Sequence, residues 1–427
     1  MSKIISIGYL TFLLFTTSVT LEAKTFSYWQ VHHMPRSIEK DYYIWRFLEQ
    51  KTTTTLEART IIKEIFHLNK KLRLSYKAKT GFDAPVVKVK KGNISEKVWK
   101  GTQRANAYFL NGLKLLQKNN KKLAISYFKT AEKNYTKRYE KDKVLFWLYM
   151  TTQKRKYLNA LHKSYHPNIY TLIAADTIQG KYPKTITQQI RKNHVIGFDI
   201  KDPISWSKIK TKMNHSSSYS IDSLARHYAS QETIGIYTYL KARASNFTKS
   251  YFPMPYRGIM KHLPIKKQAL IYAIARQESR FVPASVSSSF ALGMMQFMPF
   301  LIKDIAKRKK ESIDLDAIFD PKKSIEYADF HLKFLMKFLK HPLFIAYAYN
   351  AGIGFTKKYL KSSHHFRKGS YEPYMSIETM QNAQAREYGK KVLANYIIYM
   401  NKLGKPTRIF SLLKVLATPQ KTDTFRH

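Results

Sequence analysis

The chain has 427 residues, of which 44% are hydrophobic and 14% aromatic, which excludes a disordered protein and suffices for two or three domains. Lys and Arg outnumber Asp and Glu by 75 to 28, giving a net charge of +47. This charge either reflects Lys at solvated positions or predicts attraction to a polyanion, such as nucleic acid, a membrane surface or a wall polymer. The absence of cysteine excludes disulfides, thiolate metal sites and a lipidated Cys.

The N-terminal segment has the pattern of a secretory signal peptide over residues 1–23. Lys3 precedes the apolar run "IISIGYLTFLLF", and small or polar residues follow as far as Ala23. An uncleaved membrane anchor is the alternative. Export of the chain argues against nucleic acid as its partner.

Residues 24–250 are predicted to form successive short helices. The clearest pair surrounds Gly112 and the segment that contains Ala124 and Phe128, whose A-x3-F spacing is typical of tetratricopeptide-like hairpins. Trp147 lies in a later apolar stripe, with Val144 and Leu148, that we interpret as core of a helical superhelix.

A polar, Ser-rich stretch predicts a linker near 195–220. Pro253 and Pro255 precede a strongly periodic segment and predict a domain boundary near residue 250. From 251 to 404 the pattern is again helical, and residues 405–427 are predicted to form a C-terminal tail. The expected fold class is therefore all-α.

Glu278 stands out because it extends an apolar helix face. Ile271 and Ile274 precede it by seven and four residues, on the same side of the helix. A carboxyl group against apolar walls has a raised pKa and can donate a proton near neutral pH. The alternative is a Glu at a helix end that turns into water or pairs with Arg276 or Arg280.

The residues around Glu278 resemble the signature of soluble lytic transglycosylases, enzymes with a lysozyme-like domain that cleave the glycan strands of peptidoglycan. "RQESRF" is followed by "ALGMMQFMP". The family places a Ser nine residues after its catalytic Glu, a Gln eighteen after it and a Met two further on. Ser287, Gln296 and Met298 occupy these positions.

Two further segments resemble elements of the same family, in the same order along the chain. "AYNAG" contains Tyr349 and Asn350, and the segment around Tyr388 is similar to the family's E-T-R-x-Y-V. The sequence departs from the family pattern at Phe290, where Gly is usual, and at Gln384, Ala385 and Gly389.

The resemblance implies a helical superhelix followed by a lysozyme-like domain, and a reaction that needs one acid. Glu278 would protonate the oxygen between N-acetylmuramic acid and N-acetylglucosamine, and would then accept the proton of the C6 hydroxyl as that oxygen closes on C1. The product would be a 1,6-anhydromuramoyl end. The residues implied to bind or orient the substrate are Ser287, Gln296, Met298, Tyr349, Asn350 and Tyr388.

No metal or other cofactor is expected, and no second carboxylate is evident near Glu278 in the sequence. Glu326, Asp329, Glu378 and Glu387 are the other acids considered, and each is expected at the surface or in a helix pair. All the motifs lie within residues 251–404, so we expect the basic N-terminal half to contribute grip on the polymer.

The expected partner is the peptidoglycan glycan strand, with peripheral contact to a wall or membrane surface and a periplasmic location. Two other functions remain open from the sequence. One is a goose-type muramidase of similar fold, in which water attacks C1. The other is an inactive, basic scaffold that binds the cell wall.

Overall fold

The computed structural model describes residues 24–85, 96–362 and 364–426, and within them it contains helices and isolated β-bridges but no β-strand. The expected all-α fold class is confirmed. The expected signal peptide, residues 1–23, lies outside the described residues. Within those ranges, no helix is long and apolar enough to cross a membrane.

The N-terminal part of the chain forms four short α-helices. They are α1 (Tyr28–His32), α2 (Ile38–Leu48), α3 (Thr55–Ile61) and α4 (Lys70–Thr80), with the 3-10 helix η1 (Ile62–Glu64) after α3. Side-chain caps define several of their ends. Thr54 and Glu57 form a reciprocal capping box at the start of α3, and Gly81 ends α4 in the left-handed conformation.

A second group of helices follows, and it contains the hairpin that the sequence predicts. The helices are α5 (Glu96–Gln117), α6 (Lys121–Asn134), α7 (Arg138–Thr152), α8 (Arg155–His162) and α9 (Ile169–Thr177). Helices α5 and α6 pack closely, because a Cβ at Gly112 would lie 2.5 Å from Phe128 Cε1. The apolar residues predicted as core, Ala124, Phe128, Val144, Trp147 and Leu148, are fully buried.

The long segment without a helix begins earlier than the sequence predicts. Residues 178–202 contain no helix, whereas α10 (Pro203–Asn214) and α11 (Ser218–His227) occupy most of the range expected to be a linker. Asp202 caps α10, and Pro203 starts it at the position where the missing N–H costs nothing. Helix α12 (Ile234–Ala244) completes this group.

The C-terminal part is built from the helices that surround Glu278. They are α13 (Arg257–Met260), α14 (Ile265–Glu278), α15 (Pro299–Lys309), η2 (Leu315–Phe319), α16 (Pro321–Met336), α17 (Pro342–Ala351), α18 (Ile353–Lys361), α19 (Tyr374–Thr379), α20 (Ala383–Lys402), α21 (Ile409–Leu413) and α22 (Pro419–Thr422).

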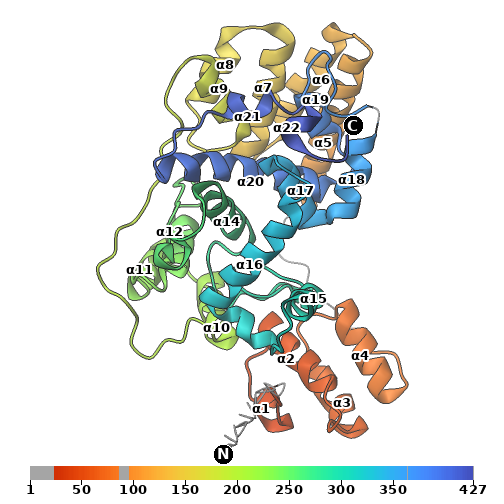
Figure 1. Cartoon of the computed structure of the whole chain (residues 1–427), viewed down its shortest axis with the longest axis vertical. Coiled ribbons are helices and arrows are strands. Elements are labelled where there is room, and N and C mark those ends of the chain that lie inside the picture. The colour runs from red at the N-terminus through yellow and green to blue at the C-terminus, as the bar shows by residue number, and fades with distance from the viewer. Residues whose placement is uncertain (1–23, 86–95, 363, 427) are drawn as a thin grey trace, which may run out of the picture.

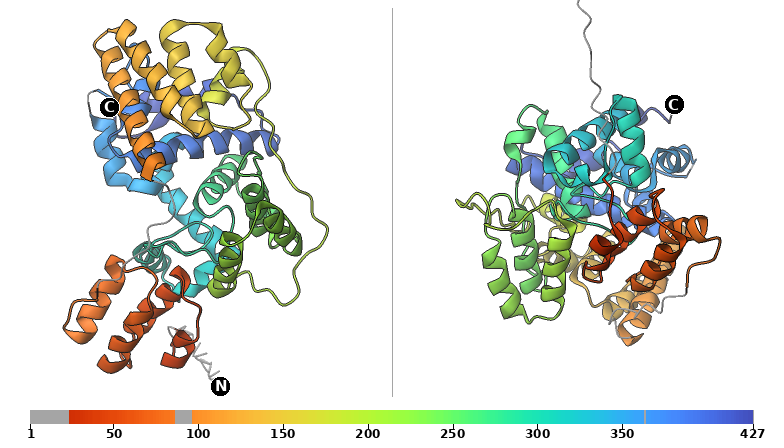
Figure 2. Two further views of the ribbon diagram at one scale, coloured as in Figure 1. Left: turned by 180° about the vertical axis from the view of Figure 1, so that it is seen from behind. Right: turned by 90° about the horizontal axis from the view of Figure 1, so that it is seen from below.

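Helices α15, α16 and α20 lie between the two N-terminal groups, whereas α19, α21 and α22 lie among the upper helices α5–α9 (Figure 1). In Figure 1, α1–α4 lie below α15 and α16, and α5–α9 lie above α20. The segment 178–202 runs along the outer edge of the molecule between the upper helices and α10, as Figure 2 also shows from behind. Helix α20 packs against α14, α17 and α9, and α10 packs against α2. One apolar core extends from the N-terminal helices α1–α9 through the C-terminal helices, and a second, smaller core lies among α10–α12, Val282 and Ala284.

Candidate active site

Glu278 is the last residue of α14, and its carboxyl group is half-buried at the end of a buried helix. Tyr388 Oη, on α20, donates a hydrogen bond of 2.6 Å to Glu278 Oε1. Burial raises the pKa of Glu278 from an ordinary value of 4.5 to about 7, and the bond from Tyr388 opposes part of this rise. The carboxyl group is therefore poised to give and take a proton near neutral pH.

The neighbouring arginines do not pair with Glu278. Arg276 donates from Nε to the carbonyl of Tyr251 at 2.9 Å. The guanidinium of Arg280 lies over the ring of Phe247, 4.9 Å from its centroid. The alternative interpretation of Glu278 as half of a helix-end ion pair is therefore wrong.

Ser287 closes a tight turn and makes no hydrogen bond with Glu278. Its Oγ accepts a bond of 2.9 Å from the Ala291 N–H, and its own N–H donates to the Ala291 carbonyl at 3.0 Å. Ser287 is half-buried, and its hydroxyl proton remains available to a ligand.

Gln296 holds its own loop together. Its Nε2 donates to the carbonyls of Ser285 and Gly293, at 3.1 and 2.9 Å. Met298 precedes the first residue of α15, and its backbone N–H has no acceptor among the residues that the structure describes. A free N–H at a helix start can bind an oxygen atom of a ligand.

Tyr349 and Asn350 lie near the end of α17. Tyr349 Oη donates to the Met295 carbonyl at 2.9 Å. Burial, with a smaller contribution from the Glu278 charge, raises the pKa of Tyr349 well above its ordinary value. The half-buried amide of Asn350 has no hydrogen-bond partner within the described part of the chain, so it is free to bind a ligand.

The structure thus joins Glu278 directly to Tyr388 alone among the residues predicted for the site. Tyr349 reaches the loop that carries Gln296, because it bonds to the neighbouring Met295. The same loop is tied to the end of α14 through Ser279, whose Oγ donates to the Met294 carbonyl at 2.8 Å.

A buried ionic network behind Tyr388 was not found from the sequence. Lys390 Nζ lies 3.0 Å from Glu378 and 2.9 Å from Glu387. Tyr139 Oη, on α7, donates to Glu387 at 2.7 Å. Burial alone would raise the pKa of Glu387, yet the Lys390 charge holds it well below its ordinary range. The network connects the N-terminal half to the turn of α20 that carries Tyr388.

The other carboxylates considered from the sequence all have basic partners. Asp329 pairs with Lys267 and Lys333, both at 2.7 Å. Glu326 pairs with Lys309 and Lys323. Of the five acids considered, Glu278 is therefore the one without a cationic partner among the described residues. Among the residues that the structure describes, no group of three or more His, Asp or Glu side chains could hold a metal ion.

The departures from the family pattern have a structural explanation at Gly389. A Cβ there would lie 2.2 Å from Tyr347 Cε1, so only Gly allows α20 to approach α17 this closely. Gln384 is exposed and Ala385 is buried at the start of α20.

The fold and the site together define a helical protein in which Glu278 is a half-buried acid at a helix end, without a cationic partner among the described residues. Residues 264–371 match the family of the transglycosylase SLT domain. The chain is 28% identical over 210 residues to the soluble lytic murein transglycosylase of Escherichia coli K12. The predicted resemblance to soluble lytic transglycosylases is therefore confirmed.

Two solved structures have a similar fold. The 70 kDa soluble lytic transglycosylase of Escherichia coli matches with a TM-score of 0.52 and 17% identity, over 90% of this chain and 68% of that one. An inactive mutant of the lytic transglycosylase Slt of Pseudomonas aeruginosa matches with a TM-score of 0.50 and 16% identity, over 86% and 63%. The sequence match to the Escherichia coli K12 relative covers 47% of this chain and 31% of the relative.

Proposed function

We propose that the chain is a peptidoglycan lytic transglycosylase in which Glu278 is the catalytic residue. The observation that carries this proposal is that Glu278, at the end of α14, has a pKa raised to about 7, accepts a hydrogen bond from Tyr388 and has no cationic partner among the described residues. Most glycoside hydrolases use two carboxylates. A reaction in which one carboxyl group is first the acid and then the base fits this site better.

In the proposed reaction, Glu278 gives its proton to the oxygen between N-acetylmuramic acid and N-acetylglucosamine, and the C1–O bond breaks. The N-acetyl group of the substrate stabilises C1. The C6 hydroxyl oxygen then bonds to C1, and its proton returns to the carboxylate. Glu278 ends in the protonated state in which it began, and no water is consumed.

The surrounding groups have proposed roles in binding. The free amide of Asn350, the N–H of Met298 and the hydroxyl proton of Ser287 are available to the sugar. Tyr388 orients the carboxyl group through its hydrogen bond. Gln296 and Tyr349 shape the wall of the site, because both bond to carbonyls of the same loop.

We further propose that residues 1–23 direct export, that the protein acts in the periplasm, and that its positive charge holds it on the acidic wall polymer. The domains proposed are a helical superhelix over 24–250, a lysozyme-like domain over 251–404 and a tail over 405–427. The partner proposed is the glycan strand of peptidoglycan.

Replacement of Glu278 tests the proposal. Glu278→Gln removes the transferable proton and little volume, so it should abolish release of soluble fragments from purified sacculi while the protein still binds them. Glu326→Gln is the matched control, because Glu326 is a carboxylate of the same part of the chain that pairs with Lys309 and Lys323. Release at the wild-type rate by Glu278→Gln would contradict the role of Glu278.

A further inference from the structure

Phe290 occupies an unusual position in the loop of residues 286–292, named here the Ser287 loop. Its φ of 60° lies in the left-handed region that favours Gly, and its side chain is fully buried. A non-Gly residue in this region is strained and persists only when its surroundings hold it. The contacts of the Phe290 ring therefore need an explanation.

The ring is held by the N-terminal helix α2. Trp45 stacks on Phe290 with the ring centroids 5.6 Å apart and an interplanar angle of 26°. Tyr42 meets the same ring edge-on at 6.0 Å. Aromatic pairs in stacked and edge-on arrangements stabilise a contact beyond the area that they bury. Asn69, which caps α4, adds a hydrogen bond of 2.8 Å from Nδ2 to the Ser288 carbonyl.

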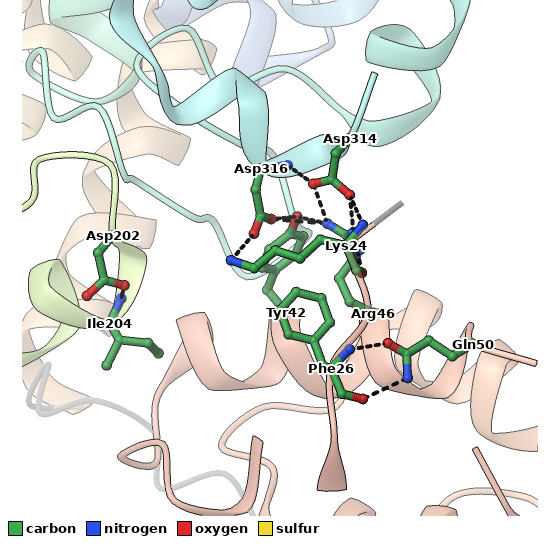
Figure 3. Close-up of polar contacts among 9 residues, drawn as sticks. All are labelled: Lys24, Phe26, Tyr42, Arg46, Gln50, Asp202, Ile204, Asp314 and Asp316. Atoms are coloured by element: carbon green, nitrogen blue, oxygen red, sulfur yellow. Dashed lines mark hydrogen bonds and ion pairs between the residues drawn. The ribbon is translucent and has the colours of Figure 1, made fainter. Parts of the chain in front are cut away.

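Helix α2 is in turn fixed to the C-terminal half next to the Ser287 loop. Arg46 bridges Asp314 and Asp316 at 2.6 and 3.0 Å, and Tyr42 Oη donates to Asp316 at 2.7 Å (Figure 3). These two acids lie at the start of η2. Gly293, which directly follows the Ser287 loop, packs against η2 so closely that a Cβ would lie 2.7 Å from the Ile318 carbonyl.

We propose that α2 is a positioning element of the active site, and that Phe290 is the positioning residue through which α2 holds the Ser287 loop beside Glu278. The position of this loop sets where the Ser287 hydroxyl lies. It also sets the positions of the Met294 and Met295 carbonyls, which accept hydrogen bonds from Ser279 and Tyr349, respectively. The N-terminal half then contributes to the chemistry as well as to grip on the polymer. This inference rests on the proposed function.

Phe290→Gly and Trp45→Ala test the inference. Gly accepts the φ of 60° without strain, so the first variant removes the anchor and spares the turn. Because misplacement by about 1 Å can cost 10²-fold, we expect kcat on soluble glycan fragments to fall about 10- to 100-fold, with KM nearly unchanged. The kcat of the Phe290→Gly, Trp45→Ala double variant should be no lower than that of Phe290→Gly alone, because both changes remove the same stacking contact.

The pH profile separates positioning from loss of folded protein. The titratable groups that face Glu278 from other helices are Tyr388 on α20 and Tyr349 on α17. Arg276 and Arg280 are its neighbours along the chain, and both point to other partners. A displaced Ser287 loop admits water to Glu278, so the alkaline limb of kcat/KM should move to lower pH. A smaller folded fraction would lower the whole profile without moving it.

Two further variants keep the test decisive. Asn69→Ser keeps a capping side chain for α4 but is too short to reach Ser288, so it should lower kcat about 2- to 5-fold without loss of stability. Trp29→Ala is the control, since Trp29 is 65% exposed in the same N-terminal group.

Each outcome decides one proposal. Wild-type kcat and pH profile in Phe290→Gly, Trp45→Ala and Asn69→Ser would overturn the positioning role, as would losses that add in the double variant. If the wild-type protein releases no glycan product, the proposed function fails before any variant is compared.

Discussion

Glu278 should lower the stability of the folded protein above neutral pH, so its replacement with Gln should stabilise the protein there. Below about pH 4.5 the carboxyl group is protonated in both the folded and the unfolded chain. As the pH rises from 4.5 to about 7 the unfolded chain ionises first, and stability falls until the folded pKa is passed. The difference between these two pKa values, at ~1.4 kcal/mol for each pH unit, corresponds to about 3 kcal/mol.

The assay is thermal unfolding of wild type and Glu278→Gln from about pH 4 to about pH 9. The melting temperature of the variant should exceed that of wild type by an amount that grows with pH and is constant above pH 7. Glu326→Gln should behave in the opposite way. Burial opposes ionisation of Glu326, but Lys309 and Lys323 lower its pKa overall, so this variant should be less stable than wild type above about pH 4.5, and the difference should shrink as the pH falls below that value. If the difference in melting temperature between Glu278→Gln and wild type is the same at about pH 4 and at about pH 9, the pKa of Glu278 is not raised by burial and the reasoning is refuted.

Four other outcomes are expected. Tyr388→Phe removes the bond that lowers the pKa of Glu278, so the alkaline limb of kcat/KM should move to higher pH in a pH–rate profile. Lys390→Met leaves the buried carboxylate of Glu378 without its cationic partner and should cost about 3–5 kcal/mol in denaturant unfolding. Gly389→Ala should cost about 1–3 kcal/mol in the same assay, and a further Tyr347→Leu change should recover part of it. Binding to purified sacculi in a sedimentation assay should weaken as salt rises, and binding that ignores salt would contradict an electrostatic grip.

The acid could be predicted from the sequence because its evidence is local. Helical spacing puts Glu278 on the face of Ile271 and Ile274, and the structure buries both and half-buries the acid. The start of α10 was also encoded locally, since Asp202 followed by Pro203 is a typical helix start. The Ser-rich composition of the surrounding segment outweighed that signal and led to the wrong position for the linker.

The contacts that support the site could not be predicted, because they join segments far apart in the chain. In the sequence, Phe290 is only a departure from the family pattern. Its role becomes visible in the structure, where Trp45 stacks on its ring. A Lys such as Lys390 is normally expected on the solvated side of a helix. Lys390 is buried because carboxylates on α19 and α20 and a tyrosine on α9 bind its ammonium group. Pairwise tertiary contacts of this kind leave no local periodicity in the sequence.

The most direct test of the proposed reaction is mass spectrometry of the fragments that the wild-type protein releases from purified sacculi. A reaction in which the C6 hydroxyl oxygen bonds to C1 and gives its proton to the Glu278 carboxylate must leave 1,6-anhydromuramoyl ends. We therefore expect these ends to be the main product of the wild-type protein and to be absent with Glu278→Gln. Reducing muramic ends would show that water attacks C1, as in a muramidase, and no release would indicate a scaffold; either result would contradict a lytic transglycosylase.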